Sequence, residues 1–253
     1  AEGKPFAHND TDACETIILA WRAAGGTGRV WIGVETLYSM DGDRAPLDEL
    51  AALADRHDAM LLLDEAHATG VYGDDGRGLA AHLEGRENVV SLHTCGKALG
   101  ASGALVLCSE VLRDFLVNRA RAFIYATAPS PLTAAAVRAA LRISAAEPQR
   151  REALHARINL ANDLLRAKLG LEPSRSQIQP IIVRSDTRAV ELARAMKALG
   201  YDIRAIRPPT VPEGTARLRL SLTLNASMEN IADLIEALAQ AQALIPADTE
   251  ASP

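Results

Sequence analysis

The stretch that decides the fold is residues 61–67, which read Leu-Leu-Leu-Asp-Glu-Ala-His. Its apolar beginning, from Met60 to Leu63, has the length of a short buried strand. Asp64 follows directly, where that strand would end. In open α/β sheets, ligands bind at the carboxyl ends of the strands. The stretch therefore predicts a buried strand whose last residues belong to a ligand site.

Strand-like and helix-like segments alternate on both sides of this stretch. Residues 29–39 predict a buried strand that runs into a loop, and Pro46 stands at the start of an amphipathic helix. Residues 89–92 and 104–107 predict two more short strands. This alternation is typical of an α/β fold, with a mostly parallel sheet and flanking helices.

The character of the sequence changes near Glu147, where a second, α+β pattern begins. Its predicted elements are a helix over 150–169, a strand over 179–183, a helix over 186–200, strands over 201–207 and 216–223, and a helix through 231–238. Asp186 is placed to cap the second of these helices. We therefore expect a large domain over 1–146, a small domain over 147–246 and a disordered tail over 247–253.

The composition excludes several classes of function. The 253 residues are 48% hydrophobic and 23% charged, with a formal net charge of −5. Such a charge gives no electrostatic footprint for nucleic acid or an anionic membrane, and no apolar run approaches the ~18 residues that span a bilayer. The three cysteines, Cys14, Cys95 and Cys108, lack metal-ligand spacing. We therefore expect a cytoplasmic protein without a metal site.

A second motif covers residues 91–100, Ser-Leu-His-Thr-Cys-Gly-Lys-Ala-Leu-Gly. Lys97 follows a predicted strand and stands between glycines, which let a backbone approach a flat cofactor. Partial burial and a cationic cofactor would make this lysine nucleophilic, as a Schiff-base lysine must be. Thr94 could donate a hydrogen bond to a phosphate oxygen. The alternative is a surface lysine in a turn.

The acidic motif at 64–67 has three interpretations. It resembles the metal-binding motif of helicase-type ATPases, and it equally resembles the aspartate that pairs with the pyridine nitrogen of pyridoxal phosphate. A strand-end acid that caps the following turn is the third. Residues 96–98, Gly-Lys-Ala, lack the Ser or Thr that a phosphate-binding loop needs after its lysine. This weakens the ATPase interpretation but leaves it open.

A third motif, Ile-Arg-Pro-Pro-Thr-Val-Pro at 206–212, follows a predicted strand. Prolines fix the backbone, so Arg207 would be held rigidly as a bidentate clamp for a substrate carboxylate. The alternative is an arginine in a proline-rich surface turn. Arg217 and Arg219 alternate with leucines, and we expect them on the polar face of a strand.

Together the motifs resemble the α-oxoamine synthase family of fold-type I pyridoxal-phosphate enzymes. The likeness begins at His-Asn-Asp of 8–10, passes through Glu-Thr-Leu-Tyr-Ser-Met-Asp-Gly-Asp of 35–43 and reaches the last predicted helix. The motif at 206–212 favours the member of biotin biosynthesis, which joins L-alanine to a pimeloyl thioester of CoA or a carrier protein with loss of CO2. Alternatives are another member, such as 2-amino-3-ketobutyrate CoA ligase, and a non-catalytic fragment.

The resemblance implies roles around the cofactor, pyridoxal 5'-phosphate. Lys97 matches the lysine that carries it, and Asp64 the acid that keeps its pyridine nitrogen protonated. Ser39 and His67 match residues that hydrogen-bond around its phenolic oxygen, and His67 could also stabilise an acyl oxyanion. Thr94 matches a phosphate contact. Catalysis is thus expected of Lys97, His67 and Asp64.

The resemblance also implies contacts beyond one subunit. Thr127 matches a position that reaches the phosphate of the neighbouring subunit, which predicts a homodimer with shared active sites. Arg207 matches the clamp on the amino-acid carboxylate, with Thr210 beside the substrate. In the family, an N-terminal portion before residue 1 supplies a phosphate-binding loop and a histidine stacked on the cofactor. Without that portion, we expect weak cofactor binding and poor dimerisation.

Overall fold

A computed structural model describes residues 2–245 of the chain. The chain divides into two compact units. The first comprises the chain up to Tyr38 together with Arg44–Pro148. The second comprises the chain from Gln149 onward together with a short inserted segment, Ser39–Asp43. The predicted tail over 247–253 lies outside the described residues.

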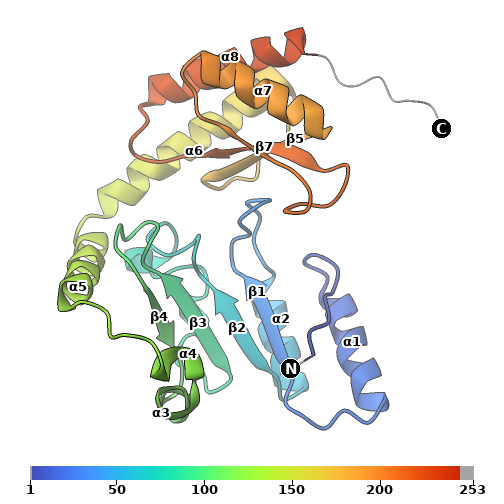
Figure 1. The fold of residues 1–253 in the computed structure, drawn as a ribbon, viewed down its shortest axis with the longest axis vertical. Helices are drawn as coiled ribbons and strands as arrows, with labels where there is room; N and C mark the ends of the chain where they lie inside the picture. Colours follow the sequence, from blue (N-terminus) through green and yellow to red (C-terminus); the bar gives the residue numbers. More distant parts are fainter. Residues whose placement is uncertain (1, 246–253) are drawn as a thin grey trace. The chain divides into compact units, whose positions relative to one another are not determined.

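The first unit is built on a four-stranded sheet with the order β1-β2-β3-β4 (Figure 1). Strands β1, β2 and β3 are parallel, and β4 runs antiparallel to β3. The elements are α1 (Thr11–Ala23), β1 (Trp31–Glu35), α2 (Leu47–Arg56), β2 (Met60–Asp64), the 3-10 turns η1 (Asp74–Gly76) and η2 (Ala81–Leu83), β3 (Val89–Thr94), β4 (Ala104–Leu107), α3 (Glu110–Arg119), α4 (Arg121–Ile124) and α5 (Pro131–Ala146).

The core of this unit lies between the sheet and helices α1 and α2. Leu61 and Leu63 of β2 are fully buried, as the apolar run at 60–63 predicts. Strand β1 differs from the expectation of a buried strand, because Trp31 is half exposed while Ile32 is buried. Among the described strands β1 pairs only with β2, so it forms an edge of the sheet.

Helices α3, α4 and α5 carry large apolar side chains that are exposed to solvent. We call this set the α3–α5 apolar surface, and its members are Val111, Phe115, Phe123, Tyr125 and Leu132. Neither α3 nor α4 has a buried residue, and α5 buries only Val137. The composition of these helices therefore suits contact with another surface better than contact with water.

The second unit is an α+β arrangement around a three-stranded antiparallel sheet with the order β5-β7-β6. Its elements are α6 (Pro148–Leu169), β5 (Ile178–Arg184), α7 (Asp186–Ala198), β6 (Arg204–Ile206), β7 (Ala216–Ser221) and α8 (Met228–Leu244). Ile158, Ile181, Leu192, Leu218 and Ile235 are almost completely buried and come from both layers. Apolar burial between helices and sheet thus stabilises this unit as well.

One expectation for this unit is wrong in detail, and another needs a correction of burial. The cap of α7 is Ser185, whose side chain accepts a hydrogen bond from Arg188 N, while Asp186 is the first helical residue. Serine and aspartate are equally good caps, so the sequence alone does not separate the two positions. Arg217 and Arg219 alternate with Leu218 and Leu220 along β7, as expected for the polar face of a strand, but Arg217 is only 3% exposed. Within residues 2–245, no helix is long and apolar enough to cross a membrane.

Candidate active site

Two adjacent parallel strands, β2 and β3, bring the acidic and lysine motifs together at the carboxyl ends of the strands of the first sheet. Asp64 is the last residue of β2, and Thr94 is the last residue of β3. The strands are parallel and in register, with Asp64 opposite Leu92, so their carboxyl ends meet. This is the edge at which α/β sheets bind ligands, as predicted for Asp64.

The loops that follow these strands place Lys97 beside His67. The Lys97 Nζ atom lies 3.0 Å from the His67 Nε2 atom. The same loops pack closely at Gly70, where an added Cβ would lie 2.7 Å from the Cβ of Ala98. Gly70 also has a φ of +78°, which other residues rarely adopt. A side chain at position 70 would therefore push the lysine loop away from His67.

Asp64 also takes part in the turn that follows β2. Its Oδ1 atom accepts a hydrogen bond from Ala66 N at 2.8 Å. The turn-capping interpretation of this acid is therefore correct. It does not compete with a cofactor role, because a carboxylate offers about four acceptor positions.

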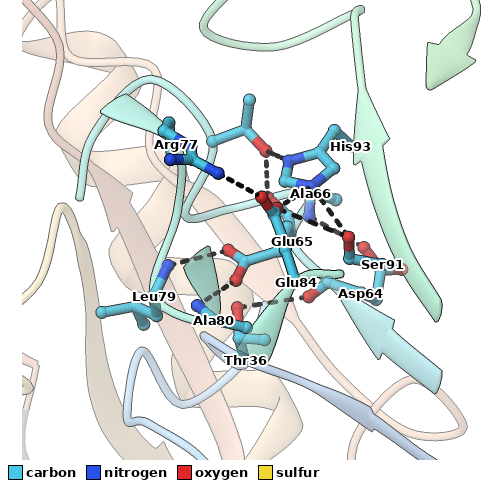
Figure 2. A network of polar contacts seen from close by, with 11 residues as sticks. Thr36, Asp64, Glu65, Ala66, Arg77, Leu79, Ala80, Glu84, Ser91 and His93 are labelled. Carbon is cyan, nitrogen blue, oxygen red and sulfur yellow. Dashed lines mark hydrogen bonds and ion pairs between the residues drawn. The ribbon is translucent and has the colours of Figure 1, made fainter. Parts of the chain in front are cut away.

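A buried carboxylate fixes the backbone directly behind Asp64 (Figure 2). Glu65 has no exposed surface, and its two carboxylate oxygens accept hydrogen bonds from Leu79 N and Ala80 N. Gly78 makes room for this contact, since a Cβ there would lie 2.4 Å from Glu65 Oε2. Glu65 thus holds residues 78–80 against the end of β2. Glu65 belongs to the motif at 61–67, but nothing in the sequence pattern indicates that its carboxylate binds backbone amides.

A second polar chain continues from this segment to β3. Figure 2 shows the His93 ring beside Glu84, with Nε2 3.1 Å from Glu84 Oε1. The other ring nitrogen, Nδ1, lies 2.9 Å from Thr69 Oγ1. Thr69 also donates to the Glu65 carbonyl oxygen at 2.8 Å, and Glu84 pairs with Arg77. Because His93 is buried, these contacts satisfy its ring nitrogens. The turn at 64–69 is therefore held from both sides.

We predict that Glu65 makes stability depend on pH. Burial raises the pKa of its carboxyl, against the lowering effect of the Ala80 and Leu79 amides. The folded state therefore keeps a proton that the unfolded state has released, so stability falls as pH rises from about 4.5 through the raised pKa. Glu65→Gln removes this dependence and lowers the free energy of unfolding by about 1–3 kcal/mol, because the amide group of the new side chain faces a backbone N–H donor.

Urea unfolding of both proteins between about pH 4 and pH 7 measures this effect. The free-energy gap between wild type and Glu65→Gln should narrow as pH rises. Glu49→Gln, at an exposed position of α2, is the matched control and should leave the pH profile unchanged. A gap that stays constant over this range would contradict the prediction.

The other predicted site residues lie elsewhere in the chain. Ser39 belongs to the inserted segment of the second unit, and its carbonyl oxygen accepts from Arg219 Nε at 2.6 Å. Arg207 and Thr210 are exposed in the turn after β6, where Thr210 N donates to the Arg207 carbonyl at 3.0 Å. The Pro208–Pro209 peptide bond in this turn is cis. Thr127 is exposed between α4 and α5.

Comparisons with known proteins define the class. The chain matches the family of class I and II aminotransferases over residues 4–238, and it belongs to that family. It is 42% identical over 240 residues to a putative 8-amino-7-oxononanoate synthase of Geobacillus kaustophilus, covering 93% of this chain and 60% of the relative. It is 44% identical over 241 residues to the 8-amino-7-oxononanoate synthase of Klebsiella pneumoniae, covering 94% and 61%. The predicted likeness to α-oxoamine synthases is confirmed.

Solved structures agree with the fold. A Sphingomonas wittichii serine palmitoyltransferase is similar with a TM-score of 0.84 and 26% identity, over 95% of this chain and 61% of that one. The 8-amino-7-oxononanoate synthase of Francisella tularensis gives a TM-score of 0.79 at 26% identity, over 95% and 68%. The fold-type I prediction is therefore confirmed. The chain spans about 60% of the length of the curated relatives.

These findings decide between the alternatives for the acidic motif. The helicase interpretation is wrong, because the chain belongs to a different family. The geometry agrees, since Glu65 is fully buried and binds backbone amides, which leaves it unsuited to a metal-bound nucleotide.

Proposed function

We propose that the protein containing this chain is a pyridoxal-phosphate-dependent acyltransferase of biotin biosynthesis. Its reaction would join L-alanine to a pimeloyl thioester of CoA or a carrier protein, giving 8-amino-7-oxononanoate, CO2 and the free thiol. The observation that carries the proposal is the 3.0 Å contact between Lys97 Nζ and His67 Nε2. It lies near the carboxyl end of β2, where Asp64 is the last residue. The names of the similar proteins support the choice of reaction.

The residues at this edge fit pyridoxal phosphate. Lys97 offers an exposed primary amine for covalent linkage, and Asp64 offers a carboxylate for the pyridine nitrogen. Thr94 would donate its hydroxyl to the phosphate. Gly96 leaves the approach open, since an added Cβ would meet no atom closer than 3.9 Å. When bound, the cofactor draws electrons from the Cα atom of the amino acid.

The chain's own residues would then move the protons. The amine of Lys97 would take the Cα proton and later return a proton after CO2 leaves. His67, within hydrogen-bond reach of Lys97, would orient that amine and donate to the oxyanion that forms at the thioester carbonyl oxygen. Asp64 would keep the ring nitrogen protonated throughout, which is why its charge matters.

The carboxylate of alanine would bind at the turn after β6. Arg207 is exposed there, so its guanidinium is open to an anion from solvent, and Thr210 lies in the same turn. A charge-assisted pair of hydrogen bonds from one guanidinium fixes both the position and the plane of a carboxylate. This contact would hold the Cα–H bond in one orientation toward the base.

A homodimer with shared sites belongs to the same proposal. The α3–α5 apolar surface supports it, since exposed apolar patches of this kind mark interaction sites. Thr127, proposed to reach the phosphate of the neighbouring subunit, lies in the segment between α4 and α5. The three cysteines are free thiols, which supports a cytoplasmic location.

A panel of amino acids and acyl thioesters tests the proposal on the protein that contains this chain. We expect L-alanine with a pimeloyl thioester to give the highest kcat/KM, about tenfold or more above glycine or L-serine, because one methyl or hydroxyl is worth that much in a fitted pocket. Thiol release and the mass of the product are the measurements.

Two results would contradict it. A preference for glycine or L-serine would assign the chain to another α-oxoamine synthase activity. Protein that binds the cofactor but releases no thiol from any pair would show that it is not catalytic. Omission of the amino acid is the control for simple thioester hydrolysis.

A further inference from the structure

The segment Ser39–Asp43 leaves the first unit and returns to it close to Asp64. At its base, Leu37 pairs with Arg44 in an isolated antiparallel bridge. Just before it, Thr36 N donates to the Asp64 carbonyl oxygen at 2.9 Å. The base of this loop is therefore fixed at the edge that carries the candidate site. The loop itself, however, packs with the second unit.

Arg217 holds the middle of this loop. Its Nη1 atom donates to the Asp41 carboxylate and to the Met40 carbonyl oxygen, the latter at 3.1 Å. Its Nε atom donates to the Thr215 carbonyl oxygen at 3.1 Å. The Arg217 side chain is only 4% exposed, whereas that of Asp41 is 45% exposed. A guanidinium cannot lose its charge, so a buried one depends on such partners.

Two further contacts hold the loop against the same sheet. Arg219 donates to the Ser39 carbonyl oxygen at 2.6 Å. Gly42 is buried and lies so close to β5 that an added Cβ would stand 2.2 Å from the Ile178 carbonyl oxygen. The loop thus touches β7 through two arginines and β5 through a glycine.

Arg217 also lies close, along the sheet, to Arg207, the proposed clamp for the substrate carboxylate. In the pairing of β6 with β7, Arg217 stands opposite Ile206, the residue before Arg207. Arg217, whose side chain holds Asp41, is therefore paired across the sheet with the residue that precedes Arg207 in the chain. Sheet pairing makes these positions parts of one rigid element.

We propose that Arg217 is a positioning residue that makes Ser39 and Arg207 move as one body. Through Asp41 and Met40 it ties the loop that carries Ser39 to the sheet that carries Arg207. Any movement of the second unit on binding a carboxylate at Arg207 then also moves the Ser39 hydroxyl, which is proposed to contact the cofactor's phenolic oxygen. The inference rests on the roles given to Ser39 and Arg207 in the proposed function.

The tie itself is tested by 15N relaxation of the Gly42 amide in the protein without cofactor. We compare wild type with Arg217→Gln and Asp41→Ala, the second at a half-exposed side chain that loses its acceptor oxygens. The order parameter of Gly42 should fall from about 0.85 to below about 0.6 in both variants. Arg204→Gln is the matched control, because Arg204 is exposed on β6 and pairs only at the surface with Asp202.

The consequence for Ser39 is tested by the visible absorbance of the bound cofactor. Ser39→Ala should shift the pH midpoint of that absorbance, and Asp41→Ala should shift it in the same direction. In a Ser39→Ala background, Asp41→Ala should add no further shift, since the hydroxyl that it misplaces is gone. Arg217→Lys, which keeps the positive charge, should restore part of the wild-type midpoint.

Two outcomes would overturn the inference. One is a Gly42 amide that stays rigid in both Asp41→Ala and Arg217→Gln. The other is a full Asp41→Ala shift that persists in the Ser39→Ala background. Failure of the protein to bind pyridoxal phosphate would instead contradict the proposed function, and the Gly42 measurement would still decide whether the tie exists.

Discussion

Replacing Lys97 with alanine is expected to abolish covalent capture of pyridoxal phosphate and to lower condensation at least about a thousandfold. The physical reason is that one amine both holds the cofactor and transfers the Cα proton. Its position supports this, since Nζ lies 3.0 Å from His67 Nε2 and the side chain is exposed to an incoming ligand. The other lysines of the sequence, Lys4, Lys168 and Lys197, lie outside the motifs at 61–67 and 91–100.

Borohydride reduction followed by peptide mass analysis is the measurement. In wild-type protein, the mass of the reduced cofactor should appear on the peptide that contains Lys97. Lys197→Ala, an exposed position of α7, is the matched control and should retain both capture and turnover. Finding the reduced cofactor on Lys4, Lys168 or Lys197 would overturn the assignment.

The sequence predicts the centre of the first unit well, because short-range patterns decide it. The apolar run that ends at Asp64 has the length of a buried strand and is too short for a typical helix. A second run ends at Thr94, close before Lys97, and parallel pairing of the two strands brings their ends together. The contact of Lys97 with His67 follows from that pairing.

Sequence reasoning fails where a surface is covered by a distant segment. Arg217 alternates with leucines as a solvated strand face would, but residues 39–43 cover that face, more than 170 positions away in the chain. The polar pattern is the same in both cases, since a buried arginine paired with Asp41 and an exposed one look alike in sequence. Only the tertiary fold distinguishes them.

Helices α3–α5 escape sequence reasoning for the opposite reason. Periodicity reveals a helix when its apolar residues face a core. In α5 the apolar residues Leu132, Leu141 and Ile143 are exposed, and only Val137 is buried. These apolar residues are therefore spaced for contact with a surface other than the core of this unit. A search for one apolar stripe facing the core does not detect such a helix.

Among substitutions that keep the shape of the side chain, Asp64→Asn is expected to have the largest effect on the reaction. Asparagine can still accept the hydrogen bond from Ala66 N, so the turn after β2 should remain intact. What is lost is the negative charge that would keep the pyridine nitrogen protonated. We expect cofactor capture on Lys97 to persist, while exchange of the alanine Cα proton slows by about 10²–10³-fold, the usual cost of removing one preorganised electrostatic contact.

Proton NMR of L-alanine in deuterated buffer measures this exchange without any acyl thioester, so it isolates the step at Cα from the later condensation. Asp74→Asn is the matched control, because Asp74 is exposed in η1 and the substitution removes the same charge. Since Glu65 fixes the backbone behind position 64, a changed fold should not mimic the effect, and unchanged urea unfolding would verify this. Exchange at the wild-type rate in Asp64→Asn would mean that another group protonates the ring, and that Asp64 serves only to cap the turn.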